Sequence, residues 1–228
     1  MENFNRTLWV CWFGVFTTSM GLSQIAPILP LYIKELGHTD TSEIAFYSGL
    51  AFGITPLGMA IFSPLWAYLG AKYGYKNMLL RASLGMSALT LWLSFAHDAM
   101  EVVLIRGLTG IVSGFTAAAV VFIAVIAPKE KVAYALGTLS TASISGSLLG
   151  PLFGGVVAGI FSISAVFDLV AFLLACSFVT IFFLFMREKF KKKQKKILKN
   201  LKKIKNLLLL FLSQLLSFSL ELLGLCLF

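Results

Sequence analysis

Long apolar stretches alternate with short polar segments along most of the chain, up to about residue 186. A helix needs about 20 mainly apolar residues to cross the roughly 30 Å hydrocarbon core of a bilayer. The connections between the stretches are short, so consecutive helices should pack as neighbours. The pattern therefore predicts an all-α membrane protein, a bundle of six transmembrane helices at residues 8–33, 44–68, 77–96, 101–126, 133–158 and 163–186.

The composition agrees with a membrane protein and argues against a soluble domain. Of the 228 residues, 58% are hydrophobic and only 13% are charged, whereas a soluble domain carries about 25% charged residues. The three cysteines are scattered, and both histidines lie in predicted loops. We therefore expect no enzymatic activity, no catalytic residues, no metal site and no cofactor.

The positive charges of the loops predict the orientation in the membrane. Lysine and arginine gather near the N-terminus and in alternate loops, at Arg6, Lys72, Lys76, Arg81, Lys129 and Lys131. Cytoplasmic loops carry an excess of these residues. We therefore expect a multi-pass protein of the cell membrane, the plasma membrane, with a cytoplasmic N-terminus.

The chain changes character after residue 186. Eleven of its 19 Lys and Arg residues fall within 187–206, a basic segment that suits the anionic surface of a lipid bilayer. Nucleic acid is not an expected partner, because no soluble fold accompanies this run. The apolar tail at 207–228 either spans the membrane or lies on its surface, and Glu221 would be costly near the bilayer centre.

Arg106 is the first candidate for a functional side chain. It lies inside the predicted fourth span, where a charge costs roughly 2.5–3.5 kcal/mol on insertion scales, so such a residue usually faces the bundle interior or a cavity. Helical spacing places small and polar residues on the same face: Thr109, Gly110, Ser113 and Thr116. The alternative is that Arg106 extends its side chain to the outer interface.

The first span offers a second candidate face, on which Met20 and Gln24 lie together with Pro27. A proline frees a backbone carbonyl, which a neighbouring helix or water must then satisfy. One interpretation is a broken helix end beside a cavity, a device that transporters use. The other is a plain kink.

Glycines are unusually dense in the predicted fifth span. Gly146, Gly150 and Gly154 are four residues apart and form one stripe, while Gly155 lies on an adjacent one. Small residues let helix backbones touch in lipid, and Pro151 bends the helix because it has no N–H to donate. The spacing fits ordinary static packing, and it also fits a face for sliding contact.

The same stretch resembles the antiporter motif of the major facilitator superfamily. "GTLSTASISGSLLGPLFGG" matches all six positions of that motif, namely Gly137, Gly146, Gly150, Pro151, Gly154 and Gly155. Arg106, Gly110 and Gly114 resemble the fourth-span motif that such families link to proton coupling. The end of the first span is similar to that of the drug-efflux branch, and the resemblance covers about residues 5–190.

The resemblance implies proton-coupled export of drugs or other small amphipathic compounds. It assigns proton coupling to Arg106 and a moving helix contact to Pro151 with its neighbouring glycines. A substrate cavity would then be lined by the candidate residues Met20, Gln24, Thr109, Ser113 and Thr116. The expected partners are protons, the amphipathic substrates and the lipid bilayer.

The loop between the second and third spans departs from the family pattern. Gly74 and Lys76 match its glycine and lysine, and Gly74 permits a tight turn. Ala71 replaces an acid, however, and Tyr75 replaces an arginine. In the family that acid helps to hold the cytoplasmic side closed, so its loss puts gating in doubt.

Length is the larger departure, because family members have twelve spans in two six-helix halves. Residues 1–186 would form only the N-terminal half, and a second half or a second copy of the chain would have to complete the cavity. The Lys-, Leu- and Phe-rich tail suggests a truncated or out-of-frame end. The alternative is a non-transporting fragment, or a half-protein that acts only by pairing.

Overall fold

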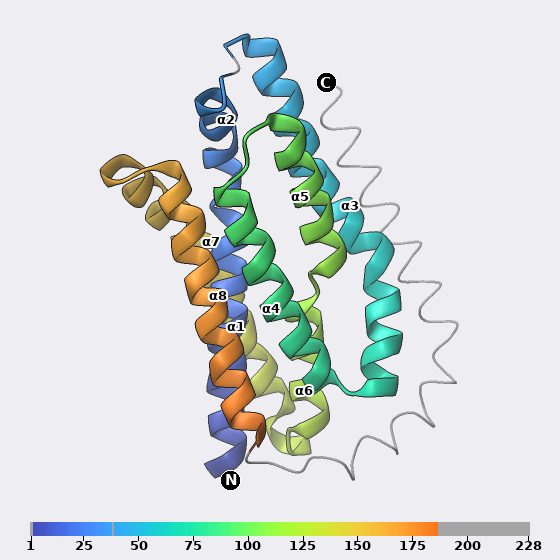
Figure 1. The fold of residues 1–228 in the computed structure, drawn as a ribbon. Coiled ribbons are helices and arrows are strands. Elements are labelled where there is room, and N and C mark those ends of the chain that lie inside the picture. The colour runs from blue at the N-terminus through green and yellow to red at the C-terminus, as the bar shows by residue number, and fades with distance from the viewer. Residues whose placement is uncertain (1, 38, 187–228) are drawn as a thin grey trace.

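The computed structural model describes residues 2–37 and 39–186, and every regular element in these ranges is a helix (Figure 1). The elements are α1 (Glu2–Ser23), α2 (Ile25–Glu35), α3 (Thr41–Tyr73), α4 (Tyr75–Ser94), α5 (Ala99–Val112), α6 (Phe115–Ile126), the short 3-10 helix η1 (Lys129–Lys131), α7 (Val132–Ile160) and α8 (Ile163–Met186). The predicted all-α class is confirmed.

Four helical stretches are long and apolar enough to cross a membrane: Thr41–Tyr73, Ala99–Ile126, Lys129–Ile160 and Ile163–Phe183. They overlap four of the predicted spans. The other two, at 8–33 and 77–96, coincide with α1 plus α2 and with α4, and their role as spans stays a prediction. The predicted basic segment 187–206 and apolar tail 207–228 lie outside the described residues.

Local sequence signals explain where several helices begin and end. Asp40 precedes α3, and its Oδ1 accepts a hydrogen bond from the Ser42 backbone N–H at 3.1 Å, as an N-cap does. Gly74 ends α3 with φ of +104°, a conformation open to glycine, and lets α4 begin at the next residue. Ser162 accepts from the Ala165 N–H at 3.1 Å and starts α8.

Two predicted spans are interrupted within the bundle. Gln24 lies in a turn between α1 and α2, three residues before Pro27, which has no N–H to continue the helical bonding. The predicted fourth span stops at Val112 and resumes at Phe115, because Gly114 has φ of +121°. The expectation of one unbroken helix over 101–126 is therefore wrong at Ser113 and Gly114.

The helices pack most extensively as three pairs, α1 with α7, α3 with α5, and α4 with α8. Two main groups of buried apolar side chains hold the bundle together, one around Leu8, Phe115 and Leu139 and the other around Ile33 and Phe167. The α3–α4 turn and the α6–α7 connection lie at the same end as the N-terminus, and the α2–α3 and α4–α5 connections lie at the other (Figure 1).

Candidate functional site

Arg106 is buried in the contact between α3 and α5, with 4% of its surface exposed. The hydroxyl of Thr55 donates to the Arg106 carbonyl oxygen at 3.0 Å, and the backbone of Thr55 also packs directly on Gly110. The Nε of Arg106 has no hydrogen-bond partner among the described residues. The structure thus turns a permanent positive charge into the bundle, as the sequence indicated.

Thr109 and Ser113 are buried on the same face of α5 as Arg106. Their hydroxyls donate to carbonyls of their own helix, Thr109 to Ile105 at 2.8 Å and Ser113 to Gly110 at 3.1 Å. Each oxygen can still accept a bond from a ligand, since a hydroxyl carries two lone pairs. This face is therefore small, polar and positively charged.

Thr116 does not continue this face in helical register. It lies in α6, beyond the break at Ser113 and Gly114, and its side chain is partly exposed. The predicted common stripe assumed an uninterrupted helix, so the expected phase of Thr116 relative to Arg106 is wrong.

Met20 and Gln24 are buried where α7 crosses the junction of α1 and α2. A Cβ built on Gly150 would lie 2.6 Å from the Met20 carbonyl oxygen, and one on Gly154 would lie 3.1 Å from the Gln24 Cβ. Gln24 is 1% exposed, and its Nε2 has no hydrogen-bond partner among the described residues. Within those residues, no hydrogen bond joins Gln24 to Arg106.

The glycines of the antiporter-like motif divide between two surfaces. Gly146, Gly150 and Gly154 face α1 and α2, and a Cβ on Gly146 would lie 2.5 Å from the Phe16 carbonyl oxygen. Gly137 and Gly155 have no such neighbour, since a Cβ there would meet nothing within 4 Å. Gly146, Gly150 and Gly154 therefore form a close helix contact within this chain, whereas Gly137 and Gly155 lie on the open face of α7.

The open face of α7 is largely apolar from Ile144 onward, and its large side chains are exposed among the described residues. Large side chains exposed along it are Ile144, Leu148, Leu152, Phe153, Val156 and Ile160. Pro151 lies between the two surfaces and is partly buried. In a membrane such a face meets lipid tails or another helix, and Gly155 would allow that helix a close approach.

The loop between α3 and α4 keeps the turn of the family pattern and lacks its acid. Gly74 is buried in the turn, and its N–H donates to the Gly70 carbonyl at 2.9 Å. Ala71, in the place of the acid, is buried next to it. Lys76 lies in the first turn of α4, and the ammonium of Lys72 stands 5.2 Å from the Tyr73 ring centre.

Arg81 and Trp66 form a cluster whose contacts sequence reasoning missed. The guanidinium carbon of Arg81 lies 3.3 Å from the centre of a Trp66 ring. Both side chains also donate hydrogen bonds to the end of α5. The charge pattern places Arg81 only at the membrane interface. The only sequence signal for this inward role is the position of Arg81 inside the predicted apolar stretch 77–96.

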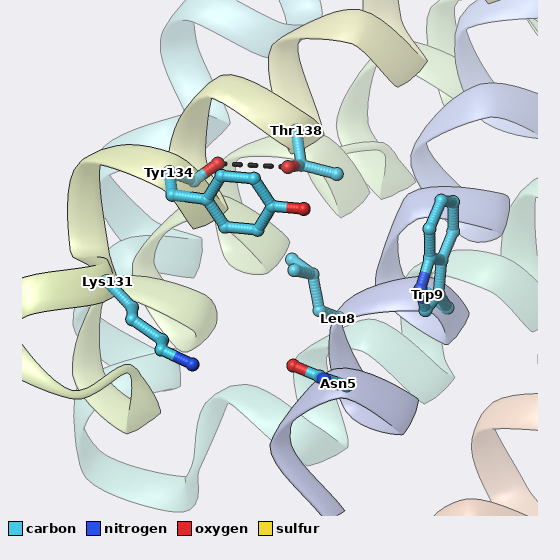
Figure 2. A pocket seen from close by; sticks show the side chains of 6 residues that line it. All are labelled: Asn5, Leu8, Trp9, Lys131, Tyr134 and Thr138. Carbon is cyan, nitrogen blue, oxygen red and sulfur yellow. Dashed lines mark hydrogen bonds between the residues drawn. The ribbon is translucent and has the colours of Figure 1, made fainter. Parts of the chain in front are cut away.

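A surface hollow of about 380 Å³ lies between the beginning of α1 and the beginning of α7 (Figure 2). In Figure 2 the Lys131 amine points toward the side chain of Asn5, and Thr138 donates to the Tyr134 carbonyl at 2.9 Å. The lining residues are Asn5, Leu8, Trp9, Lys131, Tyr134 and Thr138. None of them belongs to the site expected from the sequence.

Comparison with known proteins agrees with this arrangement of helices and motifs. The profile of the Major Facilitator Superfamily matches residues 11–228. The multidrug resistance protein MdtG of Proteus mirabilis is 40% identical over 196 residues, which cover 86% of this chain and 48% of the relative. MdtG of Salmonella paratyphi C is 43% identical over 194 residues, or 85% of this chain and 48% of the relative.

A third relative, MdtG of a Rahnella species, is 41% identical over 198 residues, again 48% of its own length. The chain thus spans about half the length of the curated relatives it matches. The profile match, by contrast, runs over most of the chain, and the helices of the structure carry the motifs that the resemblance identified. The chain is a multi-pass membrane protein that belongs to the Major Facilitator Superfamily, a family of transporters.

Proposed function

We propose that this chain forms one half of a proton-coupled exporter of drugs or other small amphipathic compounds. Its family and its relatives, which are named as multidrug resistance proteins, support this class of activity. The observation that carries the proposal is the buried guanidinium of Arg106, whose Nε is unpartnered on a polar face of α5. A charge at that depth is retained where transport chemistry uses it.

Arg106 acts on protons through another group rather than by releasing one itself. A guanidinium stays protonated throughout the physiological range. It lowers the pKa of a nearby acid because it stabilises the ionised form. Asp168, the acid within α8, is exposed rather than buried beside Arg106. Asp168 is therefore not the acid that Arg106 would act on in this proposal.

The other candidate residues have separate roles in this proposal. Thr109 and Ser113 present hydroxyl oxygens beside Arg106, and Met20 with Gln24 supplies an apolar surface and an unpartnered amide. Such mixed surfaces bind amphipathic compounds with little selectivity. Thr116, in α6, would contribute at the far side of the break.

The assembled transporter sits in the cell membrane with the N-terminus in the cytoplasm. The basic connections between α3 and α4 and between α6 and α7 lie at the same end as the N-terminus, as the positive-inside rule requires (Figure 1). A second half, or a second copy of this chain, covers the open face of α7 at Gly155 and completes the cavity.

Efflux measurements in cells that lack their own exporters test the proposal. The chain is produced alone and together with the C-terminal half of a relative, and ethidium efflux is followed with and without a protonophore. We expect protonophore-sensitive efflux from the pair, and its loss in Arg106→Ala. Lys129→Ala, which removes an exposed charge from η1, is the matched control and should transport normally.

Absence of efflux from the pair, with both proteins present in the membrane, would contradict the proposal. That outcome would favour a non-transporting membrane protein, the alternative that the coverage of about half of each relative raises. If efflux persists in Arg106→Ala, the proposed transport activity is supported, but Arg106 has no role in proton coupling.

A further inference from the structure

The end of α5 creates a backbone problem inside the bundle. The last turn of any helix leaves carbonyl oxygens without an intrahelical partner. In an apolar surrounding these oxygens must find a donor, because no water satisfies them. Here the chain leaves the helix at Ser113 and turns at Gly114, so the carbonyls of the preceding residues need partners from outside α5.

Side chains of two other helices supply those partners. Trp66 of α3 donates its Nε1–H to the Ile111 carbonyl at 2.6 Å. Arg81 of α4 donates from Nη2 to the Val112 carbonyl at 3.0 Å and to the Ser113 carbonyl at 3.4 Å. Three consecutive carbonyls at the end of α5 are thus capped by one indole and one guanidinium.

The two capping side chains also hold each other in place. The guanidinium of Arg81 stacks on Trp66, with its central carbon 3.3 Å from the ring centre. A planar guanidinium can stack on a ring and donate in its own plane at the same time, which the ammonium of lysine cannot. An arginine that merely extended to the interface would point its charge toward water. Arg81 instead points inward, is half-buried and bridges three helices.

The capped segment is the end of the polar face that carries Arg106. Ser113 belongs to both, because its carbonyl accepts from Arg81 while its buried side chain lies on the face with Arg106 and Thr109. We propose that Arg81 and Trp66 are positioning residues: they fix the break between α5 and α6 and so hold the Arg106 face in its working orientation. The working orientation presupposes the proposed function, whereas the capping of the break does not.

The first part of the proposal is that Arg81 and Trp66 fix the break between α5 and α6. It is tested by measuring a distance across the break in the full chain, reconstituted in lipid vesicles. Spin labels are placed at two exposed positions, Leu104 in α5 and Val121 in α6, after replacement of the native cysteines. We expect a narrow distance distribution that broadens or shifts in Arg81→Gln, and to a smaller extent in Trp66→Phe, which keeps an aromatic ring and loses the N–H. Lys129→Gln, a matched loss of charge at an exposed site, should leave it unchanged.

An unchanged distribution in Arg81→Gln would overturn the proposal. Should that variant fail to accumulate in the membrane, Trp66→Phe and Arg81→Lys carry the test by the same criterion. Arg81→Lys keeps the charge and a single donor nitrogen but not the planar stacking, so its distribution should lie between those of the parent and of Arg81→Gln.

Transport tests the second part, in cells that also produce the complementary half. We expect Arg81→Gln to lower kcat/KM for ethidium efflux about tenfold through a raised KM, since a charge-assisted hydrogen bond is lost, and Arg81→Lys to restore part of it. If Arg81→Gln broadens the Leu104–Val121 distance distribution but leaves efflux unaltered, Arg81 has no positioning role in transport. If the unsubstituted chain and the complementary half do not transport ethidium, that result counts against the proposed function. The spin-label distances then still test whether Arg81 and Trp66 fix the break between α5 and α6.

Discussion

At the scale of single residues, the glycines of α7 show that one sequence motif serves two different surfaces. Gly146, Gly150 and Gly154 have backbone or side-chain atoms of α1 and α2 where a Cβ would stand. Gly137 and Gly155 have open space there. The periodicity of four residues identifies the first set, but it does not say which surface each glycine meets.

This division predicts opposite effects of substitution along one helix. Gly150→Val should lower the stability of the chain by about 1–3 kcal/mol, because the new side chain would overlap the Met20 carbonyl and the Ser23 hydroxyl. Gly137→Ala should be neutral or stabilising by up to about 1 kcal/mol, since alanine is the better helix former. Thermal unfolding in a mild detergent, followed by far-ultraviolet circular dichroism, gives both values. Equal destabilisation by the two changes would contradict the assignment of surfaces.

Much of the residue-level site follows from the sequence. Burial of Arg106 is expected from its depth in an apolar stretch, and Thr109 and Ser113 follow from helical spacing. Thr116 does not follow, because a glycine with positive φ interrupts the spacing at Gly114. The bonds of Arg81 and Trp66 were also out of reach, since they depend on how α3 and α4 dock on the end of α5.

At the scale of elements, the pattern of apolar stretches predicted the helices well and their continuity poorly. The stretch at 8–33 forms α1 and α2, and the stretch at 101–126 forms α5 and α6. Hydropathy averages over a whole span, so a local turn leaves its value nearly unchanged. Gly114 and Pro27 are the local signals, and each is tolerated in membrane helices because neighbouring groups satisfy the freed backbone.

The break between α5 and α6 should depend on the backbone freedom of Gly114. Its φ of +121° is a conformation that residues with a Cβ rarely adopt, although a Cβ would find open space there. Gly114→Ala should therefore destabilise the chain by about 1–3 kcal/mol through backbone strain alone. Thermal unfolding measures the loss, and Gly155→Ala, a glycine with ordinary helical backbone and equally open space, is the control. A Gly114→Ala variant as stable as the control would show that α5 and α6 can straighten at little cost.

At the scale of the whole molecule, the bundle separates its connections into two groups with different charge. The connections at the N-terminal end, α3–α4 and α6–α7 (Figure 1), carry Lys72, Lys76, Lys129 and Lys131 with one acid, Glu130. The α4–α5 connection at the opposite end carries His97, Asp98 and Glu101. Glu101 is held in the second group, where its carboxylate accepts from the His97 backbone at 3.1 Å and from the Trp92 indole at 3.1 Å. Sequence alone predicts this separation. Each connection reverses the direction of the chain, so alternate connections lie at the same end, and the basic residues occur in alternate connections.

Thiol labelling in intact cells tests the orientation that this asymmetry predicts. Single cysteines are introduced at the exposed positions Lys129 and His97 in a chain whose native cysteines are replaced. A membrane-impermeant maleimide should label His97→Cys in intact cells and Lys129→Cys only after permeabilisation, because the proposed orientation places the positive end in the cytoplasm. Labelling of both sites after permeabilisation controls for reactivity. The reverse pattern would place the N-terminus outside, and the C-terminal end of α5, which points toward the N-terminal end of the bundle (Figure 1), would then point toward the exterior.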